Sequence, residues 1–416
     1  MKRLKLTDKL FKARVLLPTA AAAFLVTLTV YVLKGAAALE QVGLRGLYFA
    51  MSMALVFGLF LVGSILSDQN ETHMVSYLCS VTVLVAIGLA YQFLFEDFYH
   101  HLMMVLISGG VGSVAFVIWR RMNGLNRPMY RLVLLMIFGL LAANLLLAPE
   151  INGARLWIVI GGLSFQPGEL VKILLIVLGA ASFRNGRRGA LYCFASLCSC
   201  GVLLYLHDLG GAIVVFALFL LMTYLLFDSR LLSLSLMAAA VAGFICAVNI
   251  LPYAAERMAA WGKAMTETGS WQQRSYITGV LLGGFDGLGL KDAHWFTDVF
   301  SASSDGAMAG VMAVYGVPLA MVAVCAYAVL AGQALLNHSV CTSAYFIHAQ
   351  LGMYIFVQVV LNLCGSLDAL PFTGIVAPLT SDGGSATICF SVLLGIGAAA
   401  LAPRVTNTKE ETSYEI

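Results

Sequence analysis

The chain has 416 residues, of which 61% are hydrophobic and only 11% are charged, and its formal net charge is +3. This composition is too apolar for a water-soluble domain. The small positive charge matches the excess of Lys and Arg that membrane proteins keep in cytoplasmic loops, so no nucleic-acid partner is expected.

Apolar segments long enough to cross a hydrocarbon core, about 20 residues each, follow one another along the chain. Twelve of them are found, at residues 15–33, 47–66, 75–94, 102–119, 132–148, 170–183, 190–206, 212–227, 231–251, 307–332, 342–364 and 385–402. The sequence therefore predicts an all-α polytopic membrane protein, a bundle of about twelve transmembrane helices. A basic tail, 1–14, precedes the first span, which is interpreted as an uncleaved signal anchor. A polar tail, 404–416, follows the last span.

The distribution of Lys and Arg predicts the orientation of the bundle, because cytoplasmic loops retain these residues. Placing the N-terminus inside assigns 16 of the 24 basic residues to cytoplasmic segments. Seven lie on the outer side, namely Lys34, Arg45, Arg155, Arg257, Lys263, Arg274 and Lys291. We therefore expect a protein of the bacterial cytoplasmic membrane with both termini in the cytoplasm.

Two outer segments differ from the short connections elsewhere. Residues 252–305 form a large extracytoplasmic loop before the third-last helix, and long loops in compact proteins are usually functional. Residues 365–384 contain Pro371, Pro378 and paired glycines, which prevent a regular helix. Irregular backbone at membrane depth requires surrounding protein or a water-filled cavity. A cavity open to the outer face is therefore expected.

Isolated ionisable residues mark candidate sites within this apolar chain. Glu169 and Lys172 are three residues apart on one helical face, after Pro167. They form either a structural ion pair or part of a polar cavity. Asp208 and Asp305 each precede a helix, so helix capping is the simplest interpretation of both. A carboxylate at the mouth of a cavity can also act as a general base.

Basic residues on the outer side are candidates for binding an anionic phosphate group. Arg155, Arg257 and Arg274 all lie there, although each of them can also be explained as an interfacial anchor. The histidines lack a recognised metal-ligand spacing, so no metal site is expected from them.

Four separated motifs, in order over residues 150–403, resemble the SEDS (shape, elongation, division and sporulation) family, the FtsW/RodA/SpoVE-like proteins. They are N-G-A-R-x-W-I…S-F-Q-P-x-E-L-x-K from residue 152, D-L-G from residue 208, the W-Q…G-G…G run from residue 271, and G-I-V-A-P-L-T-S-D-G-G-S from residue 374. The resemblance implies a ten-helix core, here with two extra N-terminal helices. Residues 15–149 would then hold the N-terminal helices and 150–403 the catalytic membrane core.

The resemblance also implies an essential Asp eleven residues before a Gly of the following helix. Counting back from Gly316 gives Asp305, while Asp298 is a local competitor. The residues then expected to bind substrate are Glu169, Lys172, Arg155, Arg257, Arg274, Gln166, Asp208, Gln272, Ser381 and Ser385.

Several positions depart from the pattern of the family and indicate a divergent member. Asp382 stands where Tyr is usual, Gly168 replaces Ser, His207 replaces Pro, and Ser366 replaces a common Asn. Ala313 and Val314 replace acidic residues ahead of Gly316.

By this resemblance, the chain is expected to be a peptidoglycan glycosyltransferase that polymerises lipid II during elongation, division or sporulation. Asp305 would deprotonate the attacking sugar hydroxyl, cations would stabilise the departing diphosphate, and the anomeric carbon would be inverted. A class B penicillin-binding transpeptidase and membrane lipids are the implied partners. No particular cofactor is indicated, and a role for a divalent cation is left open. The alternatives are a flippase or transporter for a lipid-linked precursor and a catalytically silent scaffold.

Overall fold

The computed structural model describes residues 72–401, apart from 96–97, 123, 152, 183–184, 228, 267–268, 290–291 and 334–342. The two spans predicted at 15–33 and 47–66, and both terminal tails, lie outside the described residues. The remaining ten predicted spans all overlap helices; nine overlap one helix each, and the span at residues 307–332 contains two.

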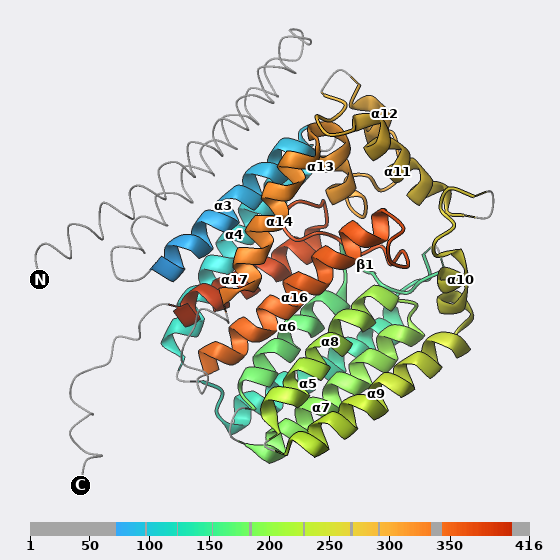
Figure 1. The fold of residues 1–416 in the computed structure, drawn as a ribbon. Helices are drawn as coiled ribbons and strands as arrows, with labels where there is room; N and C mark the ends of the chain where they lie inside the picture. The colour runs from blue at the N-terminus through green and yellow to red at the C-terminus, as the bar shows by residue number, and fades with distance from the viewer. Residues whose placement is uncertain are drawn as a thin grey trace, which may run out of the picture.

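Long helices lie side by side and make up most of the molecule (Figure 1). They are α3 (Thr72–Gln92), α4 (Phe98–Arg121), α5 (Arg127–Leu147), α6 (Pro167–Ala180), α7 (Gly186–Tyr205), α8 (Leu209–Leu226), α9 (Arg230–Ile250), α14 (Val317–Ala331), α16 (Ser343–Ser366) and α17 (Gly384–Leu401). Short connections join most consecutive helices, which therefore pack antiparallel to their neighbours.

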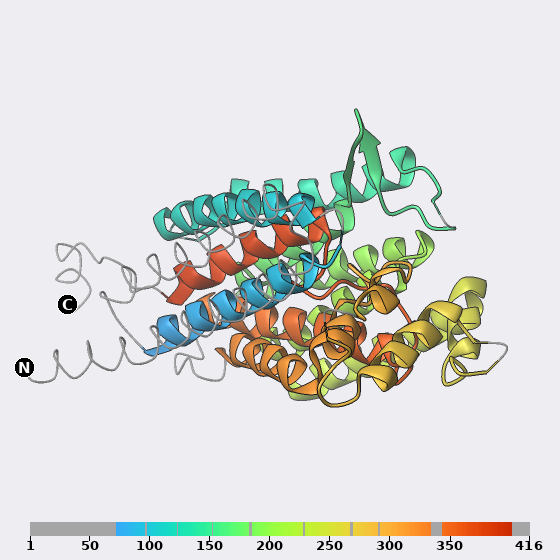
Figure 2. The same cartoon turned by 90° about the horizontal axis from the view of Figure 1, so that it is seen from above.

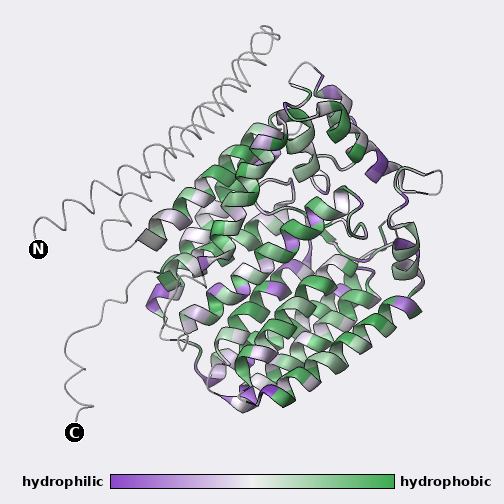
Figure 3. Cartoon of the chain, in the orientation of Figure 1, coloured by the Kyte–Doolittle hydropathy of each residue, from purple (hydrophilic) through white to green (hydrophobic). Residues whose placement is uncertain are grey.

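Seven of the described helices are long and apolar enough to cross a membrane. Their outward faces carry apolar side chains that stay largely exposed, such as Leu135 (69%) on α5 and Leu231 (79%) on α9. Apolar colouring covers the flanks of the bundle, and polar residues gather toward its ends (Figure 3). Exposed apolar surface of this extent requires lipid or another protein. The chain is a multi-pass membrane protein.

The single span predicted at residues 307–332 is instead two helices, α13 (Ala307–Tyr315) and α14. Gly316 separates them with φ 86° and ψ 168°, a conformation that L residues with side chains rarely adopt. Pro318 follows in the first turn of α14, where its missing N–H costs little. The hydropathy pattern does not detect this break because both helices are apolar.

The irregular elements gather at one end of the bundle, called here the loop end: the ends of α5, α7, α9 and α16 and the segments that follow them (Figures 1 and 2). The predicted 252–305 loop contains three helices, α10 (Pro252–Ala260), α11 (Trp271–Gly283) and α12 (His294–Thr297). Residues 367–383 form no helix, as predicted.

A hairpin of two short strands, β1 (Ile158–Ile160) and β2 (Leu163–Phe165), projects from the loop end (Figure 2). The sequence analysis predicts no strand. An apolar, β-branched run around Gly161-Gly162 is the local signal for such a hairpin.

Two clusters of buried apolar side chains form the core. One joins α3, α13, α14 and α17, and the other joins α5, α6, α7 and α8. Helix α16 contributes to both, with Leu351 in the first cluster and Phe346 in the second. Residues on α16 can therefore contact both halves of the loop end.

Candidate active site

Glu169 and Lys172 form the ion pair that their spacing predicts. Helix α6 begins at Pro167, which places both side chains on one face of the first turns. Lys172 Nζ lies 2.6 Å from Glu169 Oε1, and the side chains are only 0% and 3% exposed. The hydroxyl of Tyr354 on α16 donates a hydrogen bond to Glu169 Oε2 at 3.3 Å. The two buried charges therefore compensate each other, and a third polar group orients the carboxylate.

Asp208 is the N-cap of α8, as its sequence context suggests. Its Oδ1 accepts a hydrogen bond from the Gly211 amide at 2.7 Å. A Cβ atom built on Gly168 of α6 would lie 3.7 Å from Asp208 Oδ2. Burial raises the pKa of the Asp208 carboxyl, and the charges of Lys172 and Arg257 oppose this rise. Asp208 is therefore electrostatically coupled to the Glu169–Lys172 pair.

Asp305 lies between α12 and α13, but it does not cap α13. The N-cap of α13 is Gly306, without a side-chain hydrogen bond, so the capping interpretation is wrong. The backbone carbonyl of Asp305 accepts hydrogen bonds from Asn362 Nδ2 at 2.9 Å and Ser366 Oγ at 3.1 Å. Both donors belong to α16, which therefore fixes the backbone of Asp305.

The side chain of Asp305 is partly buried and faces the irregular segment before α17. A Cβ atom built on Gly374 would lie 3.4 Å from Asp305 Oδ2. Burial raises the pKa of Asp305 to about 7, although a hydrogen bond with Ser304 and the charge of Arg257 act in the opposite direction. A carboxylate that titrates near neutral pH is suited to accept a proton in a reaction. Asp298, the local competitor, is exposed at the end of α12.

Arg257 connects the two acidic positions. It lies on α10, and its Nη1 donates a hydrogen bond to the carbonyl of Phe372 at 3.3 Å. Its charge lowers the pKa of both Asp208 and Asp305. Arg155, Arg257 and Arg274 were the candidates for binding phosphate. Among the described contacts, only Arg257 acts on these two carboxyls.

The other two arginines make different contacts. Arg155 lies 3.5 Å from Glu150, and both side chains are about half exposed (49% and 59%). Arg274 donates from Nε to the carbonyl of Ala264 at 3.1 Å and also contacts the Thr266 carbonyl. These contacts do not connect either arginine with Asp305.

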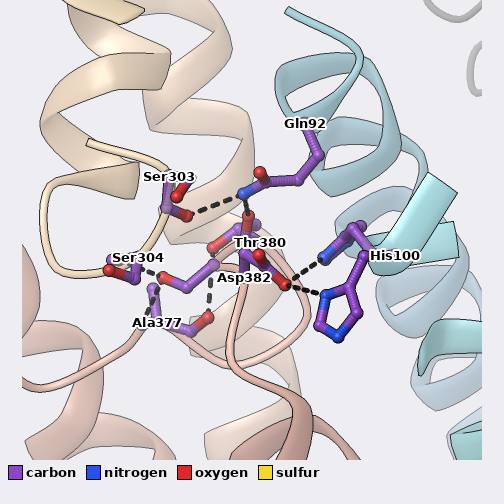
Figure 4. A network of polar contacts seen from close by, with 9 residues as sticks. Gln92, His100, Ser303, Ser304, Ala377, Thr380 and Asp382 are labelled. Atoms are coloured by element: carbon purple, nitrogen blue, oxygen red, sulfur yellow. Dashed lines mark hydrogen bonds and ion pairs between the residues drawn. The ribbon is translucent and has the colours of Figure 1, made fainter. Parts of the chain in front are cut away.

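Polar contacts clamp the loop that carries Asp305 against α3 and the segment before α17 (Figure 4). Gln92 at the end of α3 donates to the carbonyls of Ser303 at 2.8 Å and Thr380 at 3.0 Å. Ser381 Oγ donates to the Ser304 carbonyl at 2.7 Å and accepts from the Ala377 amide at 2.8 Å. Ser381, which was predicted to bind substrate, therefore uses its hydroxyl to hold this loop against the segment before α17.

Three further predicted residues make contacts at the loop end. The backbone amide of Gln166 donates to Ser385 Oγ at 3.2 Å, which joins the first and last motifs. The side-chain amide of Gln272 donates to the hydroxyl of Tyr276 at 2.7 Å. Tyr276 in turn donates to the Phe300 carbonyl at 2.9 Å, so Gln272 supports the loop before Asp305.

A stripe of buried polar residues on α16 was missed by the sequence analysis. The residues recur every fourth position and are at most 2% exposed: Gln350, Tyr354, Gln358, Asn362 and Ser366. Positions four apart share a helix face, so this spacing within an apolar span is the signal that was available. The stripe runs from the Glu169–Lys172 pair to the backbone of Asp305.

Asn362 is the member of this stripe whose loss we expect to matter most. Its Nδ2 also donates to the Ile375 carbonyl at 2.7 Å, and its Oδ1 accepts from the Met308 amide at 3.4 Å. Asn362→Ala leaves these buried groups unpaired, which we expect to lower the free energy of unfolding by about 1–3 kcal/mol. Thermal unfolding in detergent measures this loss, and Asn249→Ala on the exposed face of α9 is the control. Equal stability of the two variants would contradict a bracing role.

Within the described ranges, no three His, Cys, Asp or Glu side chains are grouped as a metal site. The cavity expected from the irregular segment stays a prediction.

Known proteins share this sequence pattern and this fold. A probable peptidoglycan glycosyltransferase FtsW from Nitrosococcus halophilus is 28% identical over 309 residues, covering 67% of this chain and 77% of that protein. A peptidoglycan glycosyltransferase RodA from Mycobacterium leprae is 27% identical over 275 residues, covering 60% of this chain and 58% of that protein.

Solved structures agree with the fold at lower sequence identity. A structure described as "Structural coordination of polymerization and crosslinking by a peptidoglycan synthase complex" contains a chain that is 23% identical, with a TM-score of 0.63. The match covers 80% of this chain and 98% of that one. The Thermus thermophilus rod shape determining protein RodA matches with a TM-score of 0.53 at 22% identity, covering 80% of this chain and 97% of that one.

The family model for the FtsW, RodA and SpoVE proteins, described as "Cell cycle protein", matches residues 72–403. This range begins well before the first recognised motif and includes ten of the twelve predicted spans. It covers far more than half of the sequence, and the chain therefore belongs to the FtsW/RodA/SpoVE family of cell cycle proteins.

Proposed function

We propose that this protein is a peptidoglycan glycosyltransferase that polymerises lipid II into glycan strands at the outer face of the cytoplasmic membrane. Relatives that carry the name peptidoglycan glycosyltransferase support the reaction class. One observation carries the proposal: Asp305, a carboxyl with a pKa of about 7, is held by α16 and lies within the electrostatic reach of Arg257.

In the proposed reaction, a hydroxyl oxygen of the acceptor sugar attacks the anomeric carbon of the donor. Asp305 accepts the hydroxyl proton as the new C–O bond forms, a contribution typically worth about 10² to 10⁴ in rate. The bond between the anomeric carbon and the lipid diphosphate breaks at the same time. A single displacement inverts the configuration at that carbon.

The leaving diphosphate needs positive charge rather than a proton. Arg257 is the nearest described candidate, because its charge already acts on Asp305 and Asp208. Lys172 is fully buried and paired with Glu169. We therefore assign Lys172 a role in shaping the electric field of the site, and Arg257 a role in direct contact with phosphate.

The proposed topology places both termini in the cytoplasm and the loop end outside. Lipid II would keep its tail in the bilayer while its head group reaches Asp305. A class B penicillin-binding transpeptidase is the proposed partner, which is supported by likeness to a chain from a peptidoglycan synthase complex. Synthesis during elongation, division or sporulation is compatible with the family description of a cell cycle protein.

Polymerisation of labelled lipid II by the purified full-length protein, alone and with its transpeptidase, tests this proposal directly. We expect glycan chains that a muramidase digests. Lipid II movement between the leaflets of vesicles without polymer formation would favour the transporter instead. Neither activity would favour the silent scaffold.

The pH dependence of glycan synthesis provides a second test. Asp305 must be ionised to accept a proton, so the rate should increase as the pH rises through about 7. Burial favours the protonated form of the Asp305 carboxyl, so this carboxyl ionises at a higher pH than an exposed one. The rate should therefore rise at that higher pH. Measuring initial rates on labelled lipid II checks this expectation. A rate that is constant between about pH 5 and pH 8 would contradict proton transfer to a group of this pKa.

A further inference from the structure

Asp382 and two histidines form a cluster that the proposed reaction does not use. Asp382 Oδ1 lies 3.5 Å from His100 Nδ1 and 3.7 Å from His101 Nδ1 (Figure 4). The side chain of His100 is 54% exposed, that of His101 only 1%, and that of Asp382 24%. A single carboxylate therefore contacts both the buried imidazole of His101 and the exposed imidazole of His100.

The buried imidazole of His101 has few other interactions. Neither of its ring nitrogens has a hydrogen-bond partner among the described residues. The described ionisable groups that act on Asp382 are His101 and His100, while Glu96 and Asp97 lie outside the described residues. Asp382 Oδ1 also has no hydrogen-bond partner among the described residues, so its 3.7 Å contact with His101 is electrostatic.

The charge state of Asp382 follows from the same contacts. Burial by itself would raise the pKa of Asp382, but the contacts with His101 and His100 outweigh burial and lower it. Asp382 is therefore ionised at neutral pH.

Close helix packing holds the histidines beside Asp382. A Cβ atom built on Gly395 of α17 would lie 2.1 Å from the carbonyl oxygen of Gly112 on α4, so the two backbones touch. Near the loop end, a Cβ atom built on Gly384 would lie 3.3 Å from Met104 Sδ. Helix α4 therefore provides a firm anchor for the turn before α17.

Two hydrogen bonds link the 381–382 turn to the segment directly before Asp305. The Asp382 amide donates to the Ser303 carbonyl at 2.8 Å. The neighbouring Ser381 hydroxyl donates to the carbonyl of Ser304, the residue directly before Asp305. A movement of the 381–382 turn would therefore move the backbone that carries Asp305.

We propose that Asp382 and His101 are positioning residues that hold Asp305 in its reactive place. The proposal rests on the proposed glycosyltransferase function. By the resemblance to the family pattern, Asp382 stands at a position where Tyr is usual. Without the contact between the carboxylate and the imidazole, the turn before α17 loosens.

The test measures kcat and KM for lipid II in wild type, Asp382→Asn, Asp382→Tyr and His101→Asn. For Asp382→Asn and His101→Asn we expect kcat to fall about tenfold and KM to change little, because small displacements of a catalytic group are costly. Asp382→Tyr should keep most of kcat.

Two substitutions serve as controls. Asp298→Asn removes an exposed carboxyl close to the same loop, and it should leave kcat and KM unchanged. His100→Gln removes the exposed histidine and should keep most of kcat, because His101 remains. Thermal unfolding of each variant in detergent identifies a variant that fails to fold, in which case Asp382→Tyr carries the test.

Several outcomes would overturn the proposal. An unchanged kcat in Asp382→Asn would remove any positioning role. A higher KM with an unchanged kcat would show a role in substrate binding and not in positioning Asp305. The cluster would be a metal site instead if a chelator abolished wild-type activity, zinc restored it, and the chelator had no effect on Asp382→Tyr. Wild type that makes no glycan at any pH would reject the proposed function, and the positioning role with it.

Discussion

Replacing Asp305 by Asn is expected to abolish glycan-chain synthesis by the purified protein while leaving its fold intact. The amide has nearly the same shape but cannot accept the proton of the attacking hydroxyl, and loss of a general base lowers rates by about 10² to 10⁴. The backbone contacts of Asp305 with Asn362 and Ser366 do not involve its side chain. Initial rates on labelled lipid II measure the loss.

The same substitution should stabilise the protein at alkaline pH. Burial raises the pKa of Asp305 to about 7, so ionisation above that pH costs stability in the folded state. Each pKa unit corresponds to about 1.4 kcal/mol, and partial exposure screens part of it. We expect Asp305→Asn to gain about 1–2 kcal/mol at pH 8 and nothing at about pH 3, where both states are protonated. Melting in detergent at the two pH values measures this difference.

Asp298→Asn is the matched control for both effects. Its carboxyl is exposed, so neither the rate nor the melting temperature should change by much. Normal polymerisation by Asp305→Asn would reject the catalytic assignment. Equal loss of activity at both positions would mean that the residue chosen as the base is wrong.

Replacing Lys172 by Met is expected to prevent accumulation of folded protein. The substitution leaves the Glu169 carboxylate buried without its partner at 2.6 Å, and such a break typically costs about 3–5 kcal/mol. Tyr354 would remain as a hydrogen-bond donor, but a neutral hydroxyl does not offset a buried charge. The yield of folded protein in detergent and its melting temperature measure the effect.

The double variant Glu169→Gln/Lys172→Met separates stability from function. It buries no ionised side chain at these two positions, so its melting temperature should return close to that of wild type. Glycan synthesis should stay low, because the field that the pair provides beside Asp208 is gone. A double variant as unstable as Lys172→Met would show that the pair contributes more than mutual charge compensation.

The helices of the core were predictable because their signal is local. A segment that crosses a bilayer needs about 20 apolar residues and must satisfy its own backbone hydrogen bonds, so hydropathy alone locates it. The Glu169–Lys172 pair was predictable for a similar reason, since residues three apart share a helix face. The break at Gly316 was not, because apolar composition continues through it.

Local sequence predicted some features of the candidate site correctly and others wrongly. Motif spacing singled out Asp305 and Asp208, and local sequence suggested an N-cap for both. Only Asp208 is one. The three outer arginines looked equivalent in sequence, yet only Arg257 is placed with the two carboxyls, whereas Arg155 and Arg274 contact other groups.

The sequence by itself determined the membrane class, the approximate positions of the apolar helices in the described region and the residues able to carry acid–base chemistry, because these depend on composition and short spacings. The tertiary structure alone decided which of those residues meet. The pKa of Asp305 and the pairing of His101 with Asp382 arise from burial and charges supplied by helices far apart in the chain. Hydropathy and spacing along one segment carry no information about such neighbours, because desolvation depends on what surrounds a group in space.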